Sequence, residues 1–159
     1  MAASKEKGDG KKNANLTYPN DDEDFHRLRK GLGESQRIVV VFTASWCGPC
    51  RRIKPFLLEE ANKRHDVPMV FADVDACGDA GADHGVTALP SVMVADALKD
   101  GSTGEITLKE VDRTVGANED ELEKLFETHV RHWVLPSAAD TATEKKQDKD
   151  GATPAVSSE

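Results

Sequence analysis

The sequence has few cysteines and no long apolar run. Only three of its 159 residues are cysteine, and three cysteines cannot build the disulfide scaffold of a small secreted domain. No stretch reaches the roughly 18 consecutive apolar residues that a membrane-spanning helix needs. The first residues contain Glu6 and Asp9 and no apolar segment, unlike a secretory signal or a transit peptide. We therefore expect a cytoplasmic protein of one domain, without membrane association.

Large aliphatic and aromatic side chains are scarce at both ends of the chain. Residues 1–19 and 137–159 hold only Leu16, Tyr18 and Val156 of that kind. Such segments cannot bury enough apolar surface to offset the loss of chain entropy. We therefore expect a disordered N-terminal arm over 1–19 and a disordered C-terminal tail over 137–159. The folded domain is predicted over residues 20–136.

Basic residues are fewer than acidic ones: the chain has 21 lysines and arginines, 29 aspartates and glutamates, and a net charge of −8. The N-terminal arm carries four lysines against Glu6 and Asp9, and the C-terminal tail carries three lysines against five acids. The two ends therefore cancel, and the domain carries the whole negative charge. An acidic domain repels phosphate backbones, which argues against a nucleic-acid partner.

Helices are predicted in three main places. Asn20 followed by Glu23 is typical of a capping box at the start of a helix. A second helix follows residue 47, and Pro55 inside it should kink it rather than end it. Asn118 is expected to cap the last helix, with Glu121 at its third position. A short helix or turn, rich in glycine and aspartate, is expected over 77–84.

Strands are predicted between these helices. The unbroken β-branched run 38–42 is typical of a central strand buried on both faces. Further strands are expected over 67–74, 91–97 and 106–115, the last with a change of apolar phase near 109–110 that indicates a bulge. Strands that alternate with helices and finish as a hairpin predict an α/β fold, a three-layer sandwich.

The clearest chemical signal is the Cys47-Gly-Pro-Cys50 motif, directly after the buried strand and at the start of a helix. Unpaired N–H groups and the helix dipole stabilise a thiolate at Cys47, and Arg51 adds positive charge. The two-residue spacing lets Cys50 reach the sulfur of Cys47. Pro49 lacks only a donor that the first helical turn leaves unpaired. This pattern indicates a redox dithiol.

The cysteines and histidines allow other interpretations. A zinc site would need two more ligands at suitable spacing, and only Cys77 and scattered histidines are available, so no metal is expected. A purely structural cysteine pair fits the intervening Gly48 and Pro49 poorly. Cys77 is either a small buried hydrophobic residue, which we favour, or a regulatory thiol.

The segment from Phe42 to Arg51 resembles the active-site segment of the thioredoxin family. Pro55 matches the helix-kinking proline of that family, and Asp73-Val-Asp75 closes the next strand as in many members. The segment Val86–Ser91 resembles the loop that carries the family's cis-proline, and Val115-Gly-Ala matches the glycine motif before the last helix. The resemblance covers about residues 22–134. It implies a mixed sheet of four or five strands between helices, with the arms as extensions.

Roles for single residues follow from this resemblance. It implies that Cys47 is the exposed nucleophile, that Cys50 is the recessed resolving thiol, and that the two form the redox-active disulfide. It also implies a cis bond between Leu89 and Pro90. The residues expected to support the active site are Trp46, Gly48, Pro49, Arg51 and Pro90. Those expected to contact substrate are Trp46, Leu89, Pro90 and Gly116.

The resemblance also implies an activity and partners. It implies a monomeric reductase of protein disulfides that holds no cofactor of its own. An NADPH-dependent flavoprotein of the thioredoxin-reductase type would recharge it, and its substrates would be disulfide-containing proteins such as peroxidases or reductases. Pro49 between the cysteines resembles the reducing branch of the family rather than its disulfide-forming branch.

One position departs from the family pattern. Members usually bury an aspartate six residues before the nucleophile, and some pair it with a lysine on the neighbouring strand. Here these positions hold Val41 and Phe71. A buried carboxylate is costly to ionise, so this exchange should stabilise the fold. It should also remove an internal base for Cys50, which predicts either slower resolution of mixed disulfides or a base supplied by water or substrate. A noncatalytic binding module of the same fold is the alternative function.

Overall fold

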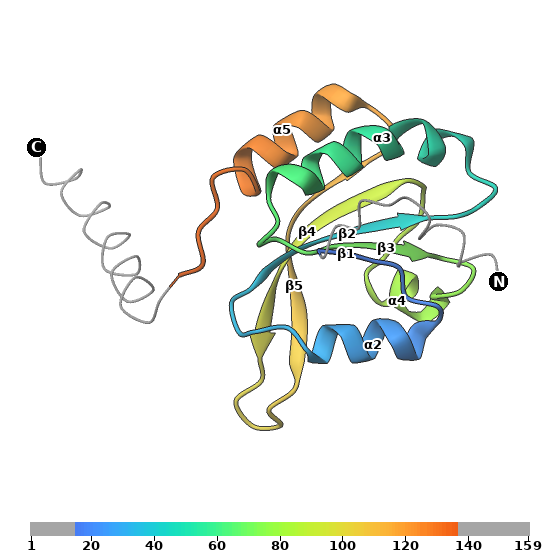
Figure 1. Cartoon of the computed structure of the whole chain (residues 1–159). Coiled ribbons are helices and arrows are strands. Elements are labelled where there is room, and N and C mark those ends of the chain that lie inside the picture. Colours follow the sequence, from blue (N-terminus) through green and yellow to red (C-terminus); the bar gives the residue numbers. More distant parts are fainter. Residues whose placement is uncertain (1–14, 137–159) are drawn as a thin grey trace, which may run out of the picture.

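The computed structural model describes residues 15–136, and these form a five-stranded mixed sheet between two layers of helices (Figure 1). The sheet order is β1-β3-β2-β4-β5, with β1, β3 and β2 parallel and with β4 antiparallel to both β2 and β5. The predicted three-layer α/β sandwich is therefore confirmed. The elements, in chain order, are β1 (Leu16–Thr17), α2 (Asp22–Lys30), β2 (Arg37–Thr43), α3 (Gly48–Lys63), β3 (Met69–Asp73), α4 (Gly78–Asp83), β4 (Ser91–Lys99), β5 (Ile106–Val115) and α5 (Glu119–His129).

Strand β2 lies at the centre of the sheet and supplies both halves of the core. Its middle five residues are all buried, because helices cover both faces of the sheet. Val39 and Val41 pack with residues of α3 and α5. Ile38, Val40 and Phe42 point the other way, toward α2 and α4. The strand therefore ends, after Thr43, between two firmly packed layers, and the redox motif follows at that edge.

The folded region begins earlier than the predicted boundary at residue 20. Leu16 and Thr17 form strand β1, which pairs in parallel with β3. Asn15 is buried, and its side-chain amide donates to the backbone carbonyls of Ala61 and Val67. The apolar pattern of the sequence did not predict this edge strand, because two residues are too few to show the periodicity of a strand. The predictions for residues 1–14 and 137–159 lie outside the described residues.

One local detail also differs from the expectation. Asp21, rather than Asn20, caps α2, since its carboxylate accepts from the Asp24 N–H at 2.8 Å. Asn20 instead donates to the Asp24 carboxylate. The bulge predicted near 109–110 is confirmed: Val94 pairs with Asp112 and Ala95 with Glu110, so Val111 is the extra residue. The predicted cis bond, the cap at Asn118 and Pro55 inside α3 are all confirmed.

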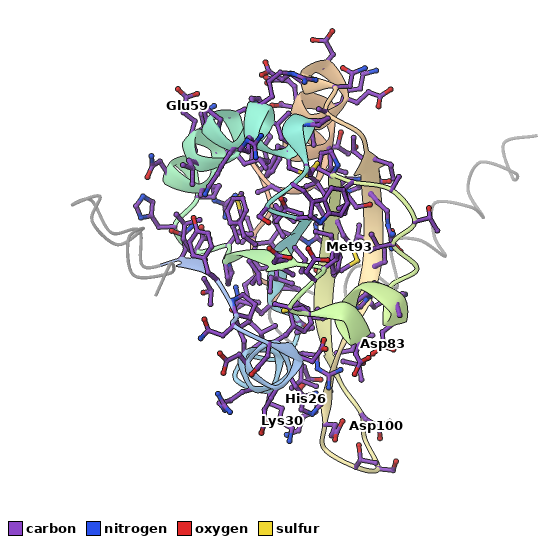
Figure 2. All side chains as sticks on the ribbon, turned by 90° about the vertical axis from the view of Figure 1, so that its right-hand side faces the viewer. His26, Lys30, Glu59, Asp83, Met93 and Asp100 are labelled. Carbon is purple, nitrogen blue, oxygen red and sulfur yellow. A yellow bond between two sulfur atoms is a disulfide. The ribbon has the colours of Figure 1, made fainter. Side chains whose placement is uncertain are left out.

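The β4–β5 hairpin extends beyond the layer formed by α2 (Figure 1). Asp100 lies at its tip (Figure 2), where its carboxylate accepts from the N–H groups of Ser102 and Thr103. Hydrogen bonds from the Thr103 N–H, then from the hydroxyl and the N–H of Ser102, lower the pKa of Asp100 to about 2. Asp100 is therefore ionised at neutral pH and accepts all three hydrogen bonds at the turn.

A buried carboxylate joins α3 to the end of α5. The Glu60 side chain is 2% exposed and accepts from Arg131 and from Lys63, the latter at 3.0 Å. Burial pushes the pKa of Glu60 upward, but the hydrogen bonds from Arg131 and Lys63 outweigh it, so the pKa is lowered overall. Glu60 is therefore ionised at neutral pH and holds the chain that follows α5 against α3.

We expect Glu60→Gln to lower the free energy of unfolding by about 2 kcal/mol at pH 7, because Arg131 and Lys63 lose their buried ionic partner and Arg131 keeps only the more exposed Glu123 and Glu127. In the wild type, the contribution of a carboxylate with a lowered pKa is present above the ordinary glutamate pKa and is lost as the pH falls through the folded value. Urea unfolding at pH 7 and pH 4 should therefore show a smaller difference between the two proteins at pH 4. Glu59→Gln, at an exposed neighbour, is the control and should change little. Equal stability of Glu60→Gln and wild type at pH 7 would contradict this role.

Candidate active site

The two cysteines of the motif lie at the junction of β2 and α3 and form a disulfide with Cα atoms 5.3 Å apart. Cys47 is the N-cap of α3, and the Cys50 N–H lies 3.2 Å from its sulfur. The Cys50 N–H, which has no partner within the helix, therefore donates to Sγ of Cys47. A thiolate formed there on reduction is stabilised by this donor and by the helix dipole.

The cysteines do not differ in exposure as expected. Cys47 is 5% exposed and Cys50 is 6% exposed, so neither is an open surface group. They differ in surroundings: Cys47 lines a surface cavity, and Cys50 is not among the residues that line it. Both pack with Ala44 and with the partly buried Leu89. Access from outside therefore runs through the cavity to Cys47.

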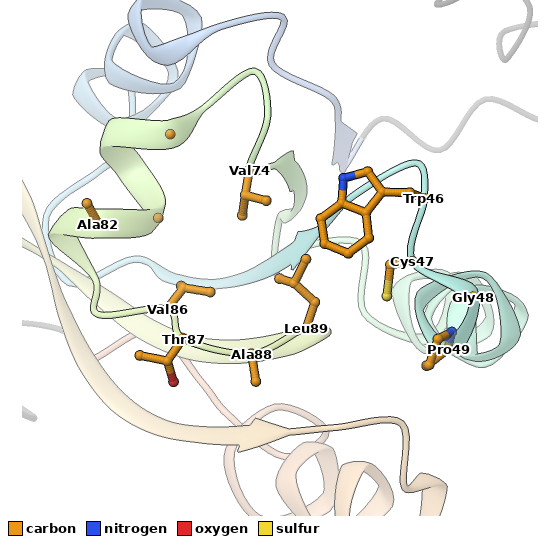
Figure 3. Close-up of a pocket in the computed structure, with 12 residues that line it drawn as sticks. Trp46, Cys47, Gly48, Pro49, Val74, Ala82, Val86, Thr87, Ala88 and Leu89 are labelled. Carbon is orange, nitrogen blue, oxygen red and sulfur yellow. The ribbon is translucent and has the colours of Figure 1, made fainter.

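Trp46 stands beside this disulfide and is 66% exposed (Figure 3). Its indole N–H donates to the Asp75 carboxylate at 2.8 Å, directly beyond the end of β3. Asp75 therefore fixes the orientation of an exposed aromatic ring at the mouth of the cavity. Gly48 and Pro49 form the exposed first turn of α3. Arg51 donates to the Ser45 carbonyl at 2.8 Å and so braces the loop before the motif.

A second loop, far along the chain, faces the cysteines. The Leu89–Pro90 bond is cis, and Pro90 is buried at the start of β4. The Pro90 carbonyl accepts from the N–H of Gly116 at 2.8 Å, and Gly116 has a φ of 105°, a conformation that favours glycine. Leu89 lines the cavity with Cys47, whereas Gly116 does not and instead supports the proline loop.

The cavity beside Cys47 has a volume of about 610 Å³ (Figure 3). Part of its lining was not predicted, because these residues belong to α4 and to the segments around it, where single residues carry no chemical signal. The spacing of the small residues in Gly78-Asp-Ala-Gly-Ala-Asp83 was the one available hint. The residues that sequence reasoning did not assign to the site are Val74, Gly78, Gly81, Ala82, Val86, Thr87 and Ala88.

The family's buried acid is replaced here by an apolar contact. Val41 on β2 pairs with Phe71 on β3, as the resemblance implied, and both are buried. Tyr18 stacks on Phe71 with ring centroids 5.2 Å apart, and the Lys54 ammonium lies 5.7 Å from the Phe71 ring centroid. Aromatic rings and the stem of a lysine therefore cover this part of the core from outside.

Cys77 lies at the start of α4 and is a free, fully buried thiol. Burial, reinforced by the charge of Asp22 and Asp73, raises the pKa of Cys77 from 9.0 to about 11. This environment fits a small core residue and does not fit a reactive thiol.

We expect Cys77 to resist alkylation in the folded protein. A pKa raised by two units leaves about one hundredth of the usual thiolate at pH 7.5, and burial slows attack further. Iodoacetamide labelling of the reduced protein, followed by peptide mass spectrometry, should modify Cys77 at least a hundredfold more slowly than Cys47. The same reaction in urea supplies the unfolded reference rate. Equal labelling of both cysteines in the folded state would disprove the inert role.

Residues 15–136 contain no group of three histidine, cysteine, aspartate or glutamate side chains that could hold a metal ion. None of the helices in the same range is both long and apolar enough to cross a membrane.

Comparisons with known proteins agree with this site. The thioredoxin family model matches residues 18–128. The chain is 41% identical over 103 residues to Thioredoxin H-type 2 of Nicotiana tabacum, which covers 65% of this chain and 79% of that protein. It is 44% identical over 94 residues to Thioredoxin H2 of Arabidopsis thaliana, covering 58% of this chain and 63% of that protein.

Solved structures give the same result. Thioredoxin NaTrxh of Nicotiana alata has 34% identity and a TM-score of 0.59, and the match covers 77% of this chain and 98% of that one. A structure concerning the thiol-resolving mechanism of yeast mitochondrial 1-Cys peroxiredoxin, through glutathione and thioredoxin systems, has 27% identity and a TM-score of 0.54, covering 74% and 98%. These relatives, with the Cys47–Cys50 pair, support a thioredoxin-type protein-disulfide reductase and do not favour a noncatalytic binding module. Since the family model spans more than two thirds of its residues, the chain belongs to the thioredoxin family.

Proposed function

We propose that Cys47 and Cys50 carry the disulfide reductase activity in two exchange steps. In the reduced protein, the Cys47 thiolate attacks one sulfur of a substrate disulfide, forms a mixed disulfide and releases the other substrate sulfur as a thiolate. Cys50, once deprotonated, then attacks Sγ of Cys47, forms the Cys47–Cys50 disulfide and releases the second substrate thiolate. Two electrons pass to the substrate, and both of its sulfurs take up protons from solvent.

The surroundings support these roles. The helix N-terminus and the Cys50 N–H stabilise charge on Cys47, which alone of the pair lines the cavity. Trp46 and Leu89 lie beside Cys47 (Figure 3) and would contact the substrate together with Pro90, whose carbonyl accepts the hydrogen bond from Gly116. The placement of Cys47 at the helix N-cap and at the cavity wall is the observation on which the proposal rests.

Membership of the family supports a proposal about partners and location. We propose that an NADPH-dependent flavoprotein of the thioredoxin-reductase type returns the disulfide to the dithiol, so that the protein acts as a cytoplasmic, monomeric electron carrier in redox homeostasis. Disulfide-containing peroxidases and reductases are the proposed substrates. The likeness to a structure concerned with resolution of a 1-Cys peroxiredoxin supports the peroxidases.

Insulin reduction tests the proposed activity. The protein, NADPH, thioredoxin reductase and insulin are mixed, and NADPH oxidation is followed. We expect turnover that depends on the protein, and a dithiol potential near the roughly −270 mV of thioredoxin. Negligible insulin reduction would overturn the proposal in favour of a binding role, and a potential far above that value would indicate an oxidant.

A further inference from the structure

The cavity beside Cys47 is mostly apolar. Val74, Val86 and Leu89 line it together with the indole of Trp46, and α4 forms the wall opposite the motif (Figure 3). None of its lining residues carries a charged side chain, and its polar side-chain groups are the Thr87 hydroxyl, the Cys47 sulfur and the Trp46 indole N–H, which donates to Asp75. A group that enters this cavity next to the sulfur of Cys47 must therefore be apolar to gain from desolvation.

The wall formed by α4 is kept free of side chains. Gly78, Gly81 and Ala82 all line the cavity, and their spacing of three and four residues places them on one face of the helix. The backbone does not demand glycine at residue 81: a Cβ there would meet Val74 Cγ1 at 3.5 Å, an ordinary contact. The missing side chains therefore leave space in the cavity and are not needed by the fold.

The glycines that leave this space lower the stability of α4, and hydrogen bonds to Asp22 offset the loss. Each glycine inside a helix costs about 1 kcal/mol relative to alanine, and α4 has only six residues. The Asp22 carboxylate, from α2, accepts from the N–H groups of Asp79 and Ala80 at 3.1 and 2.9 Å. These hydrogen bonds hold α4, which is too short and too rich in glycine to be stable alone, in place beside the cavity.

The flanks of this wall are acidic. Asp79 and Asp83 follow Gly78 and Ala82 directly in the sequence of α4, and both are exposed, although neither lines the cavity. Asp75, which holds Trp46, adds a third carboxylate at the mouth. A substrate segment that lays an apolar side chain in the cavity thus meets negative charge next to it. Lysine or arginine is the complementary residue there.

We propose that the cavity selects substrates in which a bulky apolar side chain adjoins the attacked cysteine and a lysine or arginine lies next to that apolar residue. The proposal rests on the proposed reductase function and names its substrate class. Gly78, Gly81 and Ala82 determine the apolar preference by leaving room for that side chain, and Asp79 and Asp83 determine the preference for positive charge.

Peptide disulfides test the apolar preference. Each peptide carries one mixed disulfide, with either leucine or glycine beside the cysteine and arginine next. We expect the leucine peptide to have about a tenfold higher kcat/KM, from partial burial of one side chain. Gly81→Leu fills the cavity and should bring the ratio of the two rates close to one, as should Ala82→Leu. Gly101→Leu, in the hairpin turn with nothing within 4 Å, is the control and should keep the tenfold ratio.

A second peptide pair tests the charge preference. Glutamate in place of arginine should lower kcat/KM about threefold to fivefold in low salt, and Asp79→Asn with Asp83→Asn should abolish that difference. The proposal would be overturned if the wild type had nearly the same kcat/KM for the leucine and the glycine peptide. It would also be overturned if both Gly81→Leu and Ala82→Leu kept the wild-type ratio of these two kcat/KM values. A rate per molecule that falls as the protein concentration rises would show that a second copy of the chain occupies the cavity, and this too would overturn the proposal. If wild type reduces none of the peptides, the reductase function itself has failed.

Discussion

Val41→Asp is expected to lower the free energy of unfolding by about 3–5 kcal/mol at pH 7. Val41 is 2% exposed at the centre of β2, between Phe71 on β3 and Val92 on β4. The carboxylate would face the core shared with α3 and α5, where apolar side chains surround the position. An unpaired buried charge is among the most destabilising of single changes.

The pH dependence of this effect has a definite sign. Burial would raise the folded-state pKa of the new carboxyl above its unfolded value of about 3.9. The stability deficit should therefore be smallest below that value, where both states are protonated, and should grow as the pH rises. Urea unfolding of Val41→Asp and of the neutral control Val41→Asn, at pH 4 and pH 7, measures this. Equal pH profiles for the two variants would show that a partner for the carboxylate exists at this position.

Cys50→Ser should reduce steady-state insulin reduction at least a hundredfold. Resolution of the mixed disulfide by a sulfur on the same helical turn is intramolecular, with a high effective concentration. Without it, each molecule is held as a mixed disulfide after one attack, and turnover waits for an outside thiol. Cys77→Ser is the matched control and should keep full turnover, since Cys77 is buried away from the motif. Near-normal turnover by Cys50→Ser would show that another group resolves the intermediate.

Much of this fold could be predicted from local sequence. The run 38–42 is apolar on every residue because β2 is covered on both faces, and the motif after it fixes the redox pair at a helix start. Pro55, Asn118 and the hairpin turn at Asp100 also carry strong local preferences. Each of these features depends on neighbours within a few residues along the chain.

The features that were missed depend on residues far apart in sequence. Asp22 caps α4 from 57 positions away, and Glu60 binds Arg131 across 71 positions. No local pattern distinguishes such acids from solvated ones. The cavity was not predicted for a related reason. Its wall at α4 leaves space because Gly78 and Gly81 have no side chains, and a missing side chain gives no chemical signal in the sequence. The equal burial of Cys47 and Cys50 likewise follows from packing of the Leu89 loop against both.

Identification of the attacking sulfur tests the proposed mechanism most directly. Reduced Cys50→Ser is mixed with a disulfide peptide at pH 7, quenched with acid and digested, and the mixed disulfide is located by mass spectrometry. We predict that the peptide is bound to Cys47, in one equivalent, and that Cys77 carries none. Attachment of the peptide to Cys77, or no stable mixed disulfide at all, would contradict Cys47 as the nucleophile.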